Sequence, residues 1–82
     1  MKTRDDFFST KDFYLAAYLK AKNIKLIKAV KEGKLSNFYF LKIDDMEKLI
    51  TGFYNDSETI IASKFMNAIR DLRAMIYNIS ER

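Results

Sequence analysis

The chain of 82 residues contains no cysteine, no histidine, no proline and no tryptophan, and it has only two glycines. Without cysteine there is no disulfide scaffold, and a zinc site built from cysteine and histidine is excluded as well. Catalysis by a histidine base or by a cysteine nucleophile is excluded for the same reason. We therefore expect a protein that is not an enzyme and that holds no cofactor and no metal.

Long hydrophobic runs are missing too. No apolar stretch approaches the roughly 20 residues that a membrane-spanning helix needs. The first eight residues, MKTRDDFF, carry acids where a secretory signal would carry its apolar region. We expect a cytoplasmic protein that makes no membrane contact.

The chain is rich in apolar residues and has more basic residues than acidic ones. Hydrophobic residues make up 49% of it and aromatic residues 15%, which is too rich for a disordered chain. The length fits one small domain, and its seven phenylalanines and five tyrosines can fill a small core because each large ring buries much area. Lys and Arg number 15 against 11 Asp and Glu, giving a formal net charge of +4. Such a surplus suits a negatively charged partner.

The first half of the chain predicts one helix and one β-hairpin. Ser9 is expected to cap the helix, which runs to about Lys22, and Asn23 suits the left-handed conformation that ends helices. The segment 24–31 fits either a helix or a strand by its periodicity. The turn signal Glu32-Gly33 and the aromatic, branched segment 35–43 that follows favour a hairpin.

The second half predicts two helices. Asp44 and Asp45 begin one of them, and its apolar stripe is Met46, Leu49, Ile50, Phe53 and Tyr54. Residues 59–62 read as a short extended piece. A final helix carries the seam Phe65, Ile69, Leu72, Ile76 and Ile79. The predicted fold class is α+β: a helix, a β-hairpin and two further helices packed on the hairpin, in one domain over residues 9–79 with tails at 1–8 and 80–82.

Three segments carry a resemblance to a known family. They are the opening run Ser-Thr-Lys-Asp-Phe-Tyr-Leu-Ala-Ala-Tyr-Leu at 9–19, the Phe-Tyr-Phe strand at 38–40 followed by acids, and the closing helix 65–72 with Ile76-Tyr77. Together they resemble a small single-domain family of unknown function found in bacteria and their phages, from about Ser9 to Asn78. The resemblance implies a bounded domain and a bacterial or phage setting, and it implies no reaction and no ligand.

A series of lysines is the most uneven feature in the distribution of charge along the chain. Its candidate binding members are Lys25, Lys28, Lys31, Lys34 and Lys42. Clustered lysines can contact a phosphate backbone, and such binding is sensitive to salt. The alternative is structural, because lysines are the usual exposed residues on open strand edges, where they prevent pairing with other chains. This alternative is the more common case.

The register of the hairpin sharpens the hypothesis. A two-residue turn at Glu32-Gly33 pairs Lys31 with Lys34 and Ile27 with Phe38. One face is then the expected core: Ile24, Leu26, Val30, Leu35, Tyr39 and Leu41. The other holds Lys25, Ile27, Lys31, Lys34, Phe38, Phe40 and Lys42, a mixture of rings and cations that single-strand binders use.

Two alternatives stay open for Phe38 and Phe40. Helices could cover both faces and bury them as ordinary core, which is the usual fate of phenylalanine. A one-residue bulge at Gly33 would exchange the two faces.

Tyr14 and Tyr18 lie one helical turn apart and are a candidate partner-contact face, or else residues at the margin of the core. We expect a small non-catalytic accessory protein whose lysine-rich hairpin contacts DNA or RNA with little sequence preference. The alternative is a bacterial or phage protein-interaction module, which would modulate a host complex through an acidic protein surface or form an obligate homodimer.

Overall fold

The computed structural model describes residues 7–55 and 59–80. Within these residues the element order is β1 (Phe7–Thr10), α1 (Phe13–Ala21), β2 (Leu26–Glu32), β3 (Leu35–Leu41), α2 (Met46–Tyr54) and α3 (Ala62–Ser80). The fold is α+β, as the sequence predicts. Residues 1–6 of the expected N-terminal tail and residues 81–82 of the expected C-terminal tail lie outside the described residues.

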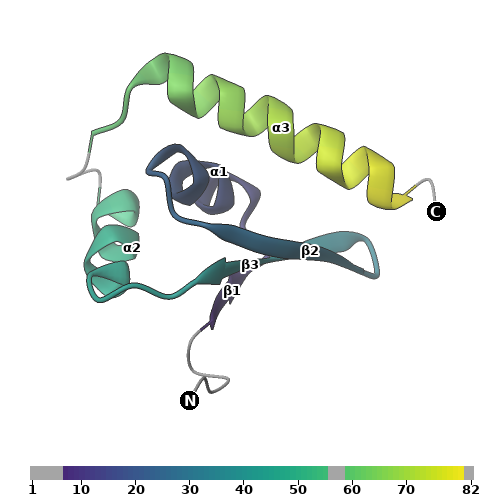
Figure 1. Cartoon of the computed structure of the whole chain (residues 1–82), viewed down its shortest axis with the longest axis horizontal. Helices are drawn as coiled ribbons and strands as arrows, with labels where there is room; N and C mark the ends of the chain where they lie inside the picture. The colour runs from purple at the N-terminus through teal and green to yellow at the C-terminus, as the bar shows by residue number, and fades with distance from the viewer. Residues whose placement is uncertain (1–6, 56–58, 81–82) are drawn as a thin grey trace.

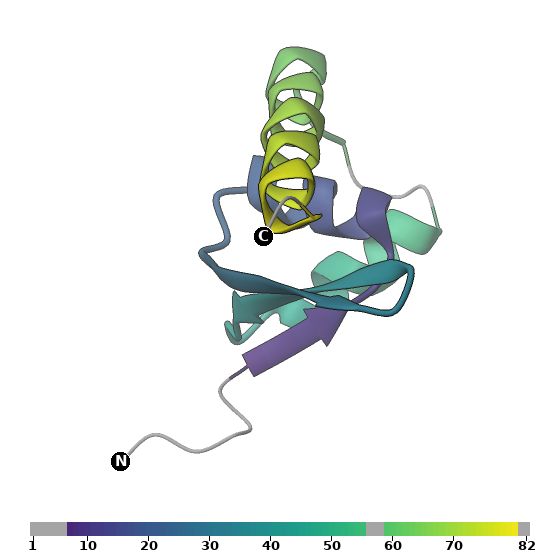
Figure 2. The ribbon, with the colours of Figure 1, turned by 90° about the vertical axis from the view of Figure 1, so that its right-hand side faces the viewer.

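The sheet has the order β1-β3-β2. Both outer strands run antiparallel to β3, so β1 and β2 run parallel to each other and α1 connects them. Helix α1 lies on one face of the sheet, and α3 crosses α1 and continues over β2 (Figure 1). In the view turned by 90°, no helix of the described residues covers the opposite face (Figure 2). We call the covered face the inner face and the opposite one the outer face.

The core lies between the inner face and the helices. Its largest fully buried side chains come from α1, β3 and α3: Leu15, Leu19, Phe38, Phe40 and Leu72. The small buried residues Ala16 and Ala17 of α1 and Ala68 of α3 allow close packing, because their short side chains let the two helices approach. The ring of Phe13 contacts Phe38 at 6.4 Å between centroids and joins the start of α1 to the sheet.

The start of α1 differs from the prediction. Ser9 does not cap the helix, because residues 7–10 form β1 and pair with β3, Ser9 opposite Tyr39. Phe7 and Phe8, expected in a tail, therefore belong to the sheet. Asp12 is the cap, and its Oδ1 accepts hydrogen bonds from the backbone N–H groups of Tyr14 at 3.1 Å and Leu15 at 3.2 Å. The sequence of residues 7–10 fits a strand as well as the start of a helix, and the pairing with β3 decides in favour of the strand.

The end of α1 is as predicted. Asn23 has a positive φ of 70°, in the left-handed region. The N–H of Ile24 donates to the carbonyl of Leu19, and the N–H of Asn23 donates to that of Lys20, each at 3.0 Å. These two bonds form the Schellman motif, which satisfies carbonyls that the helix end would otherwise leave free.

The hairpin is confirmed, but its predicted register is wrong. Glu32 pairs with Leu35 and Ala29 with Phe38, so the two-residue loop is Gly33-Lys34. Gly33 has a φ of 66° and stands at the first loop position. Favoured two-residue hairpin loops need a positive φ there, which a Glu32-Gly33 loop would have imposed on glutamate.

The new register shifts the pairing by two residues and therefore keeps Val30, Leu35 and Tyr39 on one face, as predicted. The difference is that the helices cover the other face, which holds Phe38 and Phe40. Phe38 and Phe40 point inward, while Val30, Leu35 and Tyr39 occupy the outer face. A bulge between Leu26 and Lys28 then returns Leu26 to the inner face opposite Phe40, where it packs against the core. The predicted core face and the predicted binding face were therefore largely interchanged.

The last two helices follow the sequence pattern. Met46 is buried, and Leu49, Ile50 and Phe53 pack against the core from α2. The seam of α3 does the same through Phe65, Ile69, Leu72 and Ile76. The short extended piece is not confirmed, because residues 59–61 lie in no strand and α3 already begins at Ala62.

Candidate functional site

The outer face of the sheet is covered by no helix of the described residues (Figure 2), and it carries both apolar and polar side chains. Strand alternation and the observed register place these side chains on it: Phe7, Ser9, Lys28, Val30, Glu32, Leu35, Asn37, Tyr39 and Leu41. Phe7 is 47% exposed and Leu35 is 56% exposed, which is unusual for large apolar groups on adjacent strands. Exposed apolar side chains gathered on one sheet face make it a candidate contact surface.

Tyr39 stands at the centre of this face, on the middle strand. Lys28 lies opposite it on β2, with its Nζ 4.9 Å from the centroid of the tyrosine ring. Ser9 lies opposite it on β1. The ring thus has a cation on one flank and a small hydroxyl residue on the other, and it remains partly exposed.

The hairpin lysines form no ion pair within the described residues. No carboxylate there pairs with Lys25, Lys28, Lys31, Lys34 or Lys42, and all five are exposed. The register divides them, however. Lys28 belongs to the outer face, Lys31 alternates toward the inner face, and Lys34 lies in the loop. Lys25 and Lys42 flank the other end of the hairpin, where the Leu41 N–H donates to the Lys25 carbonyl.

Two pairs of predicted site residues are not arranged as expected. Phe38 is 1% exposed and Phe40 is 0% exposed, so neither ring is available to stack on a ligand. Tyr14 is exposed, but Tyr18 is buried against Phe53, whose ring centroid lies 5.0 Å away. The two tyrosines therefore do not form one contact face.

Tyr39 and Phe7 were missed as candidates because the face that carries Tyr39 was expected to be the core and the expected tail contained Phe7. The turn favours Gly33-Lys34 over Glu32-Gly33, because the first loop position needs a positive φ. It does not identify Tyr39, because either loop leaves Tyr39 on the same face as Leu35 and the helices decide which face is buried.

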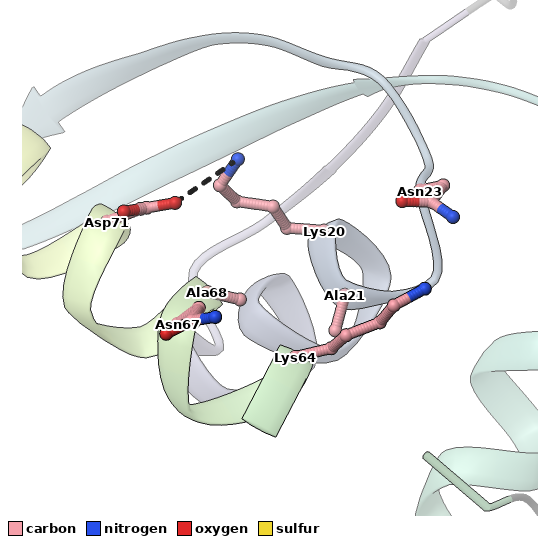
Figure 3. A pocket seen from close by; sticks show the side chains of 7 residues that line it. All are labelled: Lys20, Ala21, Asn23, Lys64, Asn67, Ala68 and Asp71. Carbon is pink, nitrogen blue, oxygen red and sulfur yellow. Dashed lines mark ion pairs between the residues drawn. The ribbon is translucent and has the colours of Figure 1, made fainter. Parts of the chain in front are cut away.

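A shallow hollow lies elsewhere, between α1 and the first half of α3 (Figure 3). Its volume is about 170 Å³, and its lining is Lys20, Ala21, Asn23, Lys64, Asn67, Ala68 and Asp71. Lys20 and Asp71 approach to 3.9 Å across it. This hollow is smaller than the usual small-molecule site of about 300 Å³ or more. A second hollow of about 380 Å³ adjoins it, and no acidic side chain of the described residues lines it; its lining is Ala21, Lys22, Asn23, Thr59, Ile60, Ile61 and Lys64.

The described residues contain no group of three or more His, Cys, Asp or Glu side chains placed to hold a metal ion. Over the same part of the chain, no helix combines the length and the hydropathy that crossing a membrane would take.

A family model for a domain of unknown function, DUF5659, matches residues 5–78. The chain belongs to this family. The match bears out the resemblance to a family of unknown function that the sequence segments carry. No match to the chain was found among curated proteins or among solved structures.

One side-chain hydrogen bond joins α2 to the start of α1 in the DUF5659 domain. The hydroxyl of Tyr54 donates to Oδ2 of Asp12 at 2.6 Å, while Oδ1 of the same carboxylate caps the helix. This hydrogen bond, with smaller contributions from burial and from the charge of Asp12, raises the pKa of Tyr54 above its ordinary value of 10.0. The neutral phenol is therefore the form that the folded state favours.

Replacing Tyr54 by phenylalanine tests this contact. We expect Tyr54→Phe to lower the free energy of unfolding by about 0.5 to 1 kcal/mol, because the hydrogen bond is exposed to solvent. Since the folded pKa is the higher one, this contribution is complete below pH 10 and is lost as the pH rises through the folded pKa. Urea unfolding of both proteins at several pH values measures the difference. A difference that grew above pH 10 would contradict the assignment.

Proposed function

We propose that this protein is a non-catalytic module that binds single-stranded nucleic acid across the outer face of its sheet, with little sequence preference. The observation that carries the proposal is the partly exposed ring of Tyr39 on the central strand, next to the unpaired cation of Lys28. Proteins that bind single strands combine these two groups, because bases stack on aromatic rings while cations follow the phosphates.

The distribution of charge supports the same partner. Lys34 extends the positive charge to the loop end of the outer face, and Lys25 with Lys42 extends it to the opposite end. None of these three has an acidic partner among the described residues. A strand lying along the sheet would meet ammonium groups at both ends and a ring in the middle. In this proposal Tyr39 and Phe7 provide the aromatic stacking that the sequence suggested for Phe38 and Phe40.

A titration of the wild-type protein tests the proposal. Fluorescence anisotropy with labelled single-stranded and duplex oligonucleotides is measured at about 50 mM and about 200 mM salt. We expect a Kd for the single strand of roughly 1 to 100 μM, weaker binding at the higher salt, and a preference over duplex DNA because paired bases cannot stack on the sheet. Absence of binding up to about 100 μM at the lower salt overturns the proposal.

A second candidate function is supported by a separate observation. The aliphatic side chains of Val30, Leu35 and Leu41 share the outer face with Tyr39, and aliphatic groups suit a protein surface. In that case the module would bind an acidic protein surface or a second copy of itself. Sedimentation velocity tests for the second copy, because the monomer has a mass of 9.7 kDa and a homodimer would have twice that mass.

A further inference from the structure

Lys28 and Tyr39 face each other across β2 and β3 on the outer face. We propose that they form a nucleotide subsite, in which one base of a single strand stacks on the Tyr39 ring and the Lys28 ammonium contacts the adjoining phosphate. This inference rests on the proposed function, because it assigns the recognition of one nucleotide within the bound strand to a particular pair of side chains.

The two groups are free to take these roles. The Lys28 ammonium lies over the tyrosine ring at 4.9 Å from its centroid, and it has no carboxylate partner among the described residues. A cation over a solvent-accessible ring is held weakly, because water competes for it, and a stacked base gains more from the same ring. The base therefore displaces the ammonium, and the long side chain of Lys28 lets that ammonium turn to the phosphate beside it.

The neighbour on the other side leaves room for a base. Ser9 lies directly opposite Tyr39 on β1, and its short side chain does not cover the ring. An aromatic or long aliphatic residue at this position would have filled the space next to the ring, since directly opposed side chains on a sheet are in contact. A base can therefore approach Tyr39 over Ser9 while Lys28 occupies the β2 side.

Charge decides between a nucleic acid and a second copy of the chain. Each copy has a formal net charge of +4, and two outer faces in contact would bring two unpaired Lys28 side chains together, because Glu32 on the same face already pairs with Lys11 at 3.3 Å. A phosphate backbone has the opposite charge and gains from the same lysine. The single strand is therefore the occupant that fits the face.

Anisotropy titrations with a labelled single-stranded oligonucleotide of about 12 nucleotides test the subsite at several salt concentrations. We expect Tyr39→Leu to weaken binding about 5- to 100-fold while the salt dependence is unchanged, because a stacking contact releases no counterions. Lys28→Met is expected to lower the slope of log K against log salt by about 0.7, the value for one phosphate contact on a single strand. Tyr39→Phe keeps the ring and is expected to bind as the wild type does.

Two exposed residues on helices provide matched controls. Tyr77 on α3 is 64% exposed and Lys48 on α2 is exposed, so Tyr77→Leu and Lys48→Met repeat the chemical changes away from the sheet. Both are expected to leave affinity and salt slope nearly unchanged. Inorganic polyphosphate, which has no bases, is expected to bind wild type and Tyr39→Leu equally.

The outcomes separate the subsite from the proposed function. If the wild type binds but Tyr39→Leu behaves as Tyr77→Leu does, or Lys28→Met keeps the full salt slope, the subsite is wrong, while single-strand binding as a function stands. If the wild type binds no oligonucleotide, both are wrong. Self-association by sedimentation that Tyr39→Leu abolishes would identify the outer face as an interface between copies and would also overturn the subsite.

Discussion

Replacing Phe40 by alanine is expected to lower the free energy of unfolding by about 3 to 5 kcal/mol. The ring is fully buried on the inner face of β3, where it meets Leu26 across the hairpin and Phe8 across the other strand pair. Alanine leaves a cavity that three strands and the helices above them would have to fill. Because a domain of this size is stable by only about 4 to 12 kcal/mol, the variant is expected to be partly or largely unfolded at 37 °C.

Urea unfolding followed by far-ultraviolet circular dichroism measures this loss. Leu35→Thr is the matched control on the outer face, and we expect it to change the unfolding free energy by no more than about 0.5 kcal/mol. If Phe40→Ala lost less than about 1 kcal/mol, or if Leu35→Thr were the more damaging change, the assignment of inner and outer faces would be wrong.

Reversing the charges of Lys28 and Lys34 is expected to weaken single-strand binding by roughly 100-fold at about 0.1 M salt. Both lysines are unpaired among the described residues, and they lie on and at the end of the outer face. Each phosphate contact on a single strand contributes about 0.7 of a decade in affinity at that salt through counterion release. The two glutamates remove both contacts and add repulsion.

The control for this double variant changes the same charge elsewhere. Lys48→Glu with Lys64→Glu alters exposed residues of α2 and α3. In either double variant, two positive charges become negative, so the formal net charge falls from +4 to zero. We expect the helix variant to bind less than about 5-fold more weakly than the wild type. Equal losses of affinity in the two variants would show that binding depends on the net charge of the protein and does not depend on the sheet face.

Much of the fold could be predicted from local chemistry. Asn23 ends α1 because it tolerates a positive φ, and the apolar stripes of α2 and α3 give their buried sides directly. These predictions succeed because each depends on residues within a few turns of one another. The start of α1 failed because Ser9 suits a helix cap as well as a strand, and its choice depends on pairing with Tyr39 thirty residues later.

The candidate site was harder to predict for a reason specific to β3. Both alternating sets of its side chains are apolar, Leu35, Tyr39 and Leu41 in one phase and Phe38 and Phe40 in the other. Hydrophobic alternation cannot choose a core face in such a strand. Gly33 fixes the pairing of β2 with β3, but either loop leaves Tyr39 on the face of Leu35 and Leu41, so the side that α1 and α3 cover (Figure 1) decides which face is buried.

Binding at the outer face can be tested most directly by recording ¹H–¹⁵N spectra of the wild-type protein during titration with a single-stranded oligonucleotide. We expect the amide signals of Lys28, Leu35 and Tyr39 to shift in proportion to occupancy, while those of Met66 and Tyr77 on α3 stay in place. Shifts that gathered on α3 and left β2 and β3 unchanged would contradict the account.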